Sequence, residues 1–413
     1  MIIWGNFAES LVRIAKLERQ QASLSAIVTR TFPSRHCAES LFAESGIPIL
    51  SCRFLYIVGQ LGPGGSERQL YYLLRSMNRS RYQPEVIVWN FRESDTYVPK
   101  IRALDVPLHN FPTASSGALK LTMLRRMVMQ IKPEVVHSYS FFTNLPAFLC
   151  TLSSNRIAIG GVRSDFGRVK DVTGPLLGRV CALWPRTQVF NSWVAAERAK
   201  KSRSFFVPKE CSVVRNGLDL EMFRPVPIAR EGRVQIVAVG SLLPVKRWDR
   251  LILAASVLKK RGFDFLIRIA GDGPLYQSLK QQTQVLGLAE CVEFIGYVDD
   301  IPRLLADASF LVHPSDSEGC PNAVMEAMAC GRAVVATAVG DVPHLVEDHK
   351  TGFVVPFGDT ATLIERVALL TSNPDLCCRM GAIGRAKAER EFGLDRLVCD
   401  TLTAYRVAGW KDS

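Results

Sequence analysis

Two glutamates placed eight positions apart carry the strongest chemical signal in this chain of 413 residues. Glu318 and Glu326 lie in SEGCPNAVMEAMACG (317–331), where Pro321 suits the first turn of a helix. The pattern predicts Glu318 in a loop after a strand and Glu326 inside a helix that Gly331 ends. Free N–H groups at a helix start attract phosphate, whereas nearby carboxylates suit hydroxyl groups. The plain alternative is a surface loop with two solvated glutamates.

A second stretch offers positive charge at the end of another predicted strand. AVGSLLPVKRWDRLILAA (238–255) reads as a strand ending at Gly240, a loop with Lys246 and Arg247, and a helix. A lysine at this point can neutralise a diphosphate as a point charge. Taken alone, Lys246 would be interpreted as an ordinary exposed lysine.

The elements that must position these residues alternate between strand and helix. Strands are predicted over 53–58, 84–90, 134–138, 187–192 and 211–217, and, after a Pro-rich link at 224–232, over 233–240, 263–271, 291–296, 308–314 and 333–338. Helices are predicted over 67–77, 123–133, 250–262, 276–287, 323–330, 362–370, 376–392 and 394–410. This alternation predicts an α/β protein with doubly wound parallel sheets. Ligands bind such sheets at the carboxyl ends of the strands.

The net charge of +12 is distributed unevenly along the chain. Residues 1–230 hold 31 Lys and Arg against 16 Asp and Glu, whereas residues 231–413 hold 20 against 23. Such asymmetry indicates either an anionic partner of the first part or a surplus that serves solubility. The 11 cysteines form no CxxC pair, which favours reduced thiols in a cytoplasmic protein. No apolar run is long enough to span a bilayer.

These stretches resemble the retaining glycosyltransferases of family 4, which have the GT-B fold. The matches run from residue 53 to the C-terminus and comprise the Glu-x7-Glu stretch, GPGGSERQL (62–70), VVRNGLDLEMFRP (213–225), VGSLLPVKR (239–247), IAGDGPL (269–275) and FIGYVDDIPRLLADASFLVHPSDSEG (294–319). Each piece is weak alone, but their order and spacing together are highly specific.

The resemblance implies two Rossmann-like doubly wound domains that face a cleft. The N-terminal acceptor domain would cover 51–227 and the C-terminal nucleotide-sugar donor domain 228–393. A C-terminal helix within 394–413 would cross back to the N-terminal domain. Residues 1–50 fall outside the resemblance, and we expect them to form a disordered extension; a short helix at 11–20 is the one element predicted there.

The resemblance also assigns donor-binding roles. Lys246, with help from Arg247, would hold the pyrophosphate, and the family's usual arginine after the strand is replaced by Ser241. Glu326 would bind the ribose hydroxyls and Glu318 the donor sugar. The remaining donor-binding residues would approach the ligand with their backbone or lie over the sugar and base: Gly64, Gly65, Val298, Gly319, Cys320, Pro321 and Asn322.

Three residues of the N-terminal domain are further candidates. The family often has His-x-His at a strand end, and here the triplet reads His137, Ser138, Tyr139. His137 joins Glu318 and Lys246 as an expected catalytic residue. Tyr139 and Arg163 would contact the acceptor or the sugar. The alternatives are a buried strand-end histidine, a packed tyrosine and a surface ion pair.

The implied activity is transfer of a hexose-type sugar from a UDP- or GDP-sugar to a saccharide, with retention of configuration, in envelope or exopolysaccharide biosynthesis. No metal and no cofactor are expected. An acceptor linked to lipid would place the protein in the cytoplasm, peripherally on the inner face of an anionic membrane. Contact is expected from a cluster of basic residues near apolar ones, namely Lys120, Arg125, Arg126 and Lys132 near Leu121, Leu124 and Met127.

Other classes of protein stay open at this point. A nucleotide-sugar epimerase would need no acceptor, and a glycogen-synthase-like enzyme would need no membrane. The stretch GPGGSE lacks the third glycine of the dinucleotide fingerprint, which argues against an NAD(P) site. No pattern typical of nucleic-acid recognition is present, so nucleic acid is not an expected partner.

Overall fold

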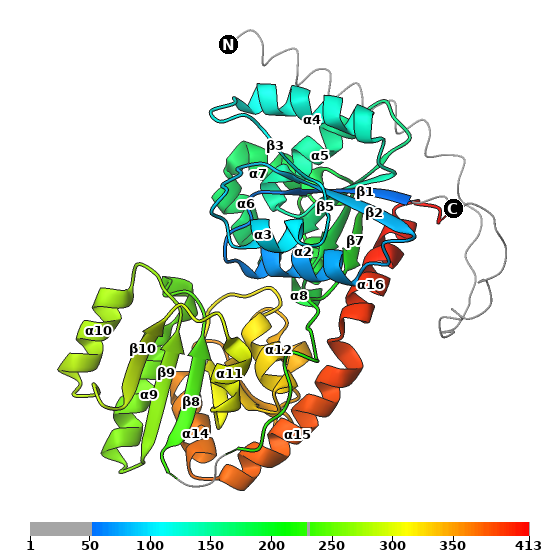
Figure 1. Ribbon diagram of the computed structural model, residues 1–413. Helices are drawn as coiled ribbons and strands as arrows, with labels where there is room; N and C mark the ends of the chain where they lie inside the picture. Colours follow the sequence, from blue (N-terminus) through cyan, green and yellow to red (C-terminus); the bar gives the residue numbers. More distant parts are fainter. Residues whose placement is uncertain (1–51, 229–231, 413) are drawn as a thin grey trace, which may run out of the picture. The chain divides into compact units, whose positions relative to one another are not determined.

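The computed structural model describes residues 52–228 and 232–412, whose strands form two parallel sheets (Figure 1). The predicted helix at 11–20 and the extension 1–50 lie outside the described residues. The seven-stranded sheet contains β1 (Cys52–Val58), β2 (Tyr82–Val88), β3 (Leu108–Asn110), β4 (Val135–Ser138), β5 (Ile157–Val162), β6 (Thr187–Phe190) and β7 (Glu210–Val213). The six-stranded sheet contains β8 (Val234–Val239), β9 (Phe265–Ala270), β10 (Val292–Gly296), β11 (Phe310–His313), β12 (Ala333–Thr337) and β13 (Gly352–Val355).

Both sheets are wound in the same order. The first runs β3-β2-β1-β4-β5-β6-β7 and the second β10-β9-β8-β11-β12-β13. In each sheet the chain starts at a central strand, moves to one edge and then returns to build the other half. The strand order therefore reverses beside β1 and β8, and ligands of doubly wound folds bind at such switch points. The GT-B prediction of two Rossmann-like domains is confirmed.

Alternate residues of β1 show how helices cover both faces of the first sheet. Phe54, Tyr56 and Val58 pack with α2 (Gly65–Ser76) and α3 (Tyr97–Arg102). Leu55 and Ile57 point the other way, toward α4 (Gly117–Ile131) and α5 (Asn144–Thr151). A strand buried on both faces needs apolar side chains at every position, which explains the continuous run FLYIV.

The second sheet is covered in the same way. Ile236 and Ala238 of β8 pack with α9 (Trp248–Lys260) and α14 (Thr360–Thr371). Val237, between them in sequence, packs with α11 (Ile301–Ala306), α12 (Asn322–Ala329) and the end of α15 (Pro374–Glu391). The remaining α-helices in the described part of this domain are α10 (Tyr276–Val285) and α13 (Val342–Leu345).

The last helix, α16 (Leu394–Val407), belongs to the core of the first sheet. Tyr405 lies with its hydroxyl 2.9 Å from Nδ1 of His137 and 3.0 Å from the hydroxyl of Tyr56. Trp410 donates from its indole nitrogen to Glu134 over 2.8 Å. The predicted return of the C-terminal helix to the N-terminal domain is thereby confirmed.

The apolar residues predicted to contact a membrane from α4 pack largely against the domain core. Leu124 is fully buried, and Leu121 and Met127 pack against the same core beneath the helix. Lys120 is also engaged, since its ammonium donates to the carbonyl of Trp89 over 2.7 Å. The helix uses its apolar stripe to cover the sheet, as amphipathic helices of globular domains do. None of the described helices is long and apolar enough to span a membrane.

Candidate functional site

The loop between β11 and α12 places the two glutamates as the sequence predicts. Glu318 lies in the loop and Glu326 on the buried face of α12. Pro321 precedes the helix, and no side chain caps the N–H groups of its first turn. The same is true of α2 in the other domain, where Gly64 takes the cap position. Two uncapped helix starts therefore lie near the switch points, α2 after β1 and α12 after β11, the neighbour of β8, and both can bind anions.

These two helix starts meet closely. A Cβ atom added to Gly65 would lie 2.7 Å from Nδ2 of Asn322. Oδ1 of Asn322 accepts from the side-chain amide of Asn216 over 2.8 Å. Gln69 of α2 bonds both the N–H and the carbonyl of Gly217, over 2.7 and 2.9 Å. A side chain at position 65 would therefore displace the amide of Asn322.

Lys246, Glu318 and His313 form a charged cluster at the carboxyl end of the second sheet. Lys246, in the short 3-10 helix η2 (Pro244–Lys246), donates from Nζ to Oε1 of Glu318 over 2.6 Å. Nε2 of His313, the last residue of β11, lies 2.9 Å from the same oxygen. Burial opposes ionisation of Glu318, but His313 and Lys246 outweigh it and hold the pKa of this carboxyl far below its usual range. The carboxylate therefore stays charged at physiological pH.

Arg247 turns away from this cluster. Its guanidinium pairs with Asp249 over 2.8 Å and with Asp316 over 2.9 Å. Asp316 also pairs with Arg250 over 2.7 Å, so the loop before Glu318 is fixed by two arginines. The structure thus brings Lys246, and not Arg247, to Glu318. In this geometry Arg247 holds the loop in place.

Glu326 meets a cation that the sequence did not indicate. Its Oε1 accepts from Arg68 of α2, so the two domains share an ion pair at this point. Glu326 is almost fully buried and Arg68 largely so. Burial would lower the pKa of Arg68, but Glu326 reverses this and raises it. A ribose that binds Glu326 must therefore share or displace Arg68.

Gly319 and Cys320 contribute backbone to the site. A Cβ added to Gly319 would lie 2.8 Å from Oδ1 of Asn191, so the loop passes close to the N-terminal domain. The carbonyl of Gly319 accepts from the N–H of Asp341 over 2.8 Å. Cys320 is buried, which raises its thiol pKa to about 12, and its carbonyl accepts from Asn216. The Cys320 thiol is thus inert at neutral pH.

Two residues outside this loop border the site, namely the predicted Val298 and Asp341, which was not predicted. Val298 is half-buried and packs against the core of α11 and α12, after Gly296 with a φ of 68°. The carboxylate of Asp341 accepts from the Ser192 hydroxyl over 2.8 Å and from the N–H of Val194 over 3.2 Å. Asp341 thereby ties the second domain to the start of α8 (Trp193–Lys201) in the first.

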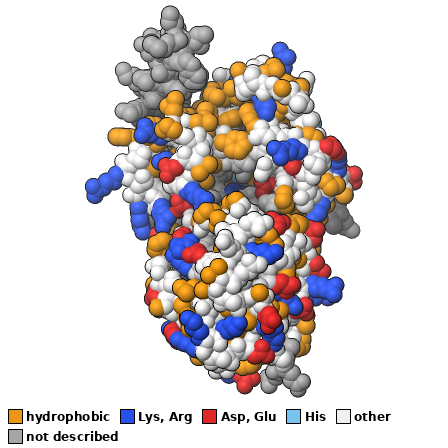
Figure 2. Space-filling model, turned by 90° about the vertical axis from the view of Figure 1, so that its left-hand side faces the viewer, with side chains coloured by type: hydrophobic (Ala, Val, Ile, Leu, Met, Phe, Trp, Pro, Cys, Tyr) orange, Lys and Arg blue, Asp and Glu red, His pale blue; other side chains and the backbone are white. Residues whose placement is uncertain are grey.

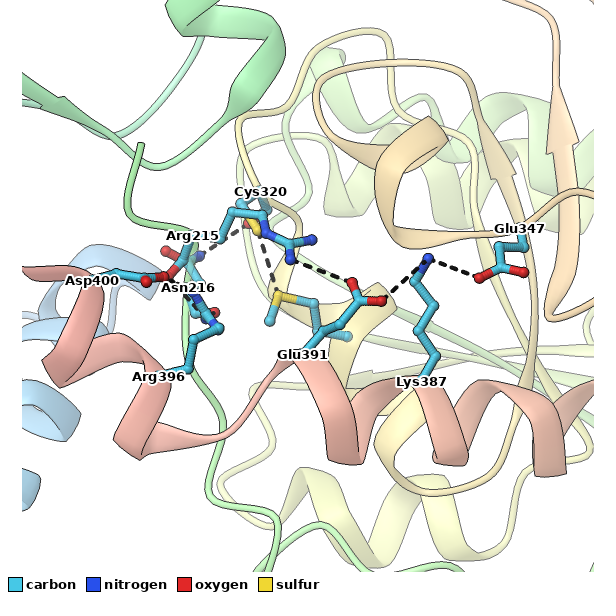
Figure 3. Close-up of polar contacts among 9 residues, drawn as sticks. Arg215, Asn216, Cys320, Glu347, Lys387, Glu391, Arg396 and Asp400 are labelled. Atoms are coloured by element: carbon cyan, nitrogen blue, oxygen red, sulfur yellow. Dashed lines mark hydrogen bonds and ion pairs between the residues drawn. The ribbon is translucent and has the colours of Figure 1, made fainter. Parts of the chain in front are cut away.

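The segment that leaves β7 is held by the junction of α15 and α16 (Figure 3). Arg396 donates to the carbonyls of Arg215 and Asn216 over 3.2 and 2.6 Å and pairs with Asp400. Arg215 in turn pairs with Glu391 over 3.3 Å. Because Asn216 contacts Asn322 and Cys320, these bonds connect the start of α12 to the C-terminal helices.

His137 lies apart from the charged cluster. Its ring is buried beneath Tyr56 and Tyr139 and contacts Tyr405. Burial, together with Arg163, lowers the pKa of His137 well below its usual value, so the ring is neutral at physiological pH. This geometry agrees with the alternative of a buried strand-end histidine, and its predicted catalytic role has no support in these contacts.

Tyr139 and Arg163 are stacked on each other. The Arg163 guanidinium carbon lies 3.7 Å from the centre of the Tyr139 ring. Tyr139 is buried, whereas Arg163 is half-exposed, and Nε and Nη1 of Arg163 have no hydrogen-bond partner among the described residues. An arginine with unpaired donors at the end of β5 can bind an anionic ligand.

The described residues contain no group of three or more His, Cys, Asp or Glu side chains that could hold a metal ion.

The comparisons with known proteins agree with this arrangement. Residues 221–387 match the family model of the glycosyl transferases group 1. WcaL of Escherichia coli (strain K12), provisionally named a colanic acid biosynthesis glycosyltransferase, is 34% identical over 196 residues, which are 45% of this chain and 48% of WcaL. A GDP-mannose-dependent alpha-(1-6)-phosphatidylinositol monomannoside mannosyltransferase of Mycolicibacterium smegmatis is 33% identical over 187 residues, 41% of this chain and 49% of that protein.

A solved structure extends the likeness to both domains. Anabaena Alr3699/HepE in complex with UDP superposes with a TM-score of 0.71 and 19% identity, over 87% of this chain and all of that one. At this identity the likeness establishes the fold. The chain spans about half the length of the curated relatives that it matches. The match of residues 221–387 to the group 1 model and the shared GT-B fold agree with the resemblance to family 4 glycosyltransferases.

Residues outside the predicted set complete the site: Arg68, Gln69, Asn191, Asn216, His313 and Asp341. His313 ends a predicted strand and Arg68 follows the Gly-Gly pair, so both stood beside predicted residues. Their interaction partners come from segments far away in the sequence, and no local sequence pattern indicates these partners.

Proposed function

We propose that the chain is a retaining glycosyltransferase that moves a hexose-type sugar from a UDP- or GDP-sugar to a saccharide acceptor. The observation that carries the proposal is the contact of Lys246 with Glu318 beside the uncapped start of α12, opposite the Gly64–Gly65 loop. A sugar diphosphate needs its phosphates neutralised and its hydroxyls bound, and this combination of a cation, two helix N-termini and a carboxylate supports the proposal.

In the proposed reaction the bond between the anomeric carbon and the diphosphate oxygen breaks while the acceptor oxygen bonds to that carbon on the same face. The acceptor proton passes to the departing diphosphate oxygen. Lys246 and the N–H groups of α2 and α12 would stabilise the charge on the leaving diphosphate. Preorganised hydrogen-bond donors of this kind usually supply the largest part of transition-state stabilisation. Glu318 would hold the sugar hydroxyls and Glu326 the ribose.

The comparisons support both co-substrates. HepE binds UDP and UDP-glucose in its solved structures, and the mycobacterial relative is named for GDP-mannose. WcaL and AmsK of Erwinia amylovora are named for colanic acid and amylovoran biosynthesis, and the mycobacterial relative acts on a phosphatidylinositol mannoside. We therefore propose an acceptor linked to lipid, in envelope or exopolysaccharide biosynthesis at the cytoplasmic face of the membrane.

A thermal-shift screen against UDP, GDP, ADP and their sugar conjugates tests the donor, because a ligand that binds the native state raises Tm. One nucleotide should raise Tm, and Lys246→Met should reduce the rise at equal nucleotide concentration. Lys280→Met is the matched control, since Lys280 is exposed on α10 near Tyr276, in the same domain. Absence of any nucleotide-dependent shift would overturn the proposal.

Transfer is then measured with the nucleotide sugar that binds and with lipid-extract or oligosaccharide acceptors. Release of nucleoside diphosphate that requires the acceptor supports the proposal. A modified nucleotide sugar formed without any acceptor would indicate an epimerase instead. Extension of a soluble glucan primer without membrane lipid would indicate a glycogen-synthase-like enzyme.

A further inference from the structure

Large apolar side chains protrude from the helical hairpin of α6 (Phe166–Thr173) and α7 (Pro175–Leu183). Val172 is 80% exposed and Leu176 68%, one on each side of the turn, and Leu177 follows them. Phe205, in the connection after α8, is 93% exposed. We call these four residues the α6–α7 ridge. Contiguous exposed apolar residues of this size mark interaction surfaces in soluble proteins.

The segment that carries Phe205 lies against the hairpin. The guanidinium carbon of Arg179 in α7 lies 5.6 Å from the ring centre of Phe206. Val207 packs into the same cluster as Phe166 and Val169 of α6. The connection after α8 therefore runs along both helices of the hairpin.

The hairpin holds the ridge rigidly outward. A Cβ added to Gly178 would lie 2.2 Å from the carbonyl oxygen of Lys170, so the two helix backbones are in direct contact. The inner side of the hairpin is already filled by Phe166, Cys181 and Ala182. Val172 and Leu176 consequently have no room to turn inward.

Positive charge surrounds the ridge. Residues 166–209 contain nine Lys and Arg but only two Asp and Glu. Within the described residues, no ion pair engages Arg168, Lys170, Arg179 or Arg203. Figure 2 shows hydrophobic side chains gathered on the N-terminal domain with Lys and Arg around them. This stretch thus holds a large share of the positive excess of the first part of the chain.

We propose that the α6–α7 ridge docks on an anionic lipid surface, with Val172, Leu176, Leu177 and Phe205 entering the headgroup region. Apolar side chains ringed by Lys and Arg match a layer of hydrocarbon under negative phosphates. A second copy of the chain would bring an equally basic face, which repels. This surface differs from the α4 contact that the sequence predicted. The proposal extends the proposed function, but its test measures lipid binding and not sugar transfer.

The test is flotation of the full chain with vesicles of phosphatidylcholine and phosphatidylglycerol in equal parts, or of phosphatidylcholine alone, at low and high salt. The wild-type protein should float with the anionic vesicles at low salt. Val172→Ser with Leu176→Ser should lower the partition coefficient at least about tenfold. Arg168→Gln with Arg203→Gln should lower it by about fivefold for each charge.

Matched controls come from the second domain. Val285 is 79% and Phe357 64% exposed, so Val285→Ser with Phe357→Ser removes comparable apolar surface. Arg303→Gln with Arg379→Gln removes two exposed charges. All variants should keep the wild-type Tm and the nucleotide-dependent rise in Tm, which separates this proposal from the proposed function.

Three results would overturn the docking proposal. The wild-type protein could fail to bind anionic vesicles, the ridge variants could bind as well as the wild type, or the controls could lose as much binding as the ridge variants. If the ridge variants abolish self-association in sedimentation without changing lipid binding, the surface joins copies of the chain instead.

Discussion

Glu318→Gln and Lys246→Met should change the affinity for a nucleoside diphosphate in opposite directions. Nζ of Lys246 lies 2.6 Å from Oε1 of Glu318, and His313 lies 2.9 Å from the same oxygen. A diphosphate that binds Lys246 enters next to this ionised carboxylate. Gln keeps the shape of the side chain and removes the repulsion, whereas Met removes the attraction.

The expected size follows from the charges. One negative charge about 6 Å from a diphosphate, at an effective dielectric constant of about 20 to 40, contributes ~1.4 to 2.8 kcal/mol of repulsion. Glu318→Gln should therefore tighten UDP or GDP binding by roughly tenfold or more. Lys246→Met removes a charge-assisted hydrogen bond of about 1.5 to 3 kcal/mol and should weaken binding by a similar factor.

Calorimetric titration with UDP and GDP measures the two affinities, and a transfer assay measures turnover. Glu318→Gln should reduce turnover by about two orders of magnitude or more although the diphosphate binds better, because the sugar loses its positioning carboxylate. Glu293→Gln, at an exposed position, is the control. If both site variants weaken diphosphate binding equally, the carboxylate does not face the phosphates and the reasoning fails.

Three further outcomes test the same geometry. A double-mutant cycle of Arg68→Ala and Glu326→Ala should give a coupling energy of about 1 to 3 kcal/mol in urea unfolding, and strict additivity would contradict the ion pair. Gly65→Ala adds a methyl 2.7 Å from the side-chain amide at the start of α12 and should weaken nucleotide binding, whereas Gly117→Ala, with open space around it, should not. Because the pKa of Glu318 is lowered by folding, the stability it contributes is complete above the unfolded value near about 4.3 and is lost as pH falls toward the folded pKa. Below about pH 4 the wild type should lose stability relative to Glu318→Gln by up to about 1.4 kcal/mol per pH unit, and parallel urea midpoints for the two proteins would refute this.

Strand–helix periodicity was sufficient to predict both sheets, because each central strand is a continuous apolar run. It failed where strands are short or where tertiary contacts set the ends. β3 has three residues and β13 opens with a glycine, so neither was predicted. The predicted strand 211–217 ends at Val213, since the following residues leave the sheet to bond Gln69 and Arg396.

The N-terminal candidates show a limit of a different kind. His137 and Tyr139 were predicted at the site because they end a strand. The face of the sheet to which each side chain points depends on the register of the strand, because neighbouring strand residues point to opposite faces. β4 pairs His137 with Tyr56 of β1, which turns its ring toward the face covered by α16. The residue that fills this face, Tyr405, is 268 positions away. Local sequence could therefore place His137 near the switch point, but it could not predict on which face of the sheet its ring lies.

The ion-pair partners of the site residues were harder to predict than the positions of those residues in the fold. Lys246 and Glu318 were each expected to touch a different part of one ligand. Side chains that bind the same small ligand also lie close to each other when the ligand is not bound. Opposite charges at that distance pair unless something separates them, and here His313 shares the same oxygen of Glu318. Glu326 has likewise taken Arg68 as its partner. The two carboxylates thus hold one cation from each domain. A donor that binds both sites must therefore rearrange two ion pairs, one of which joins the domains, so donor binding is expected to be coupled to the contact between them.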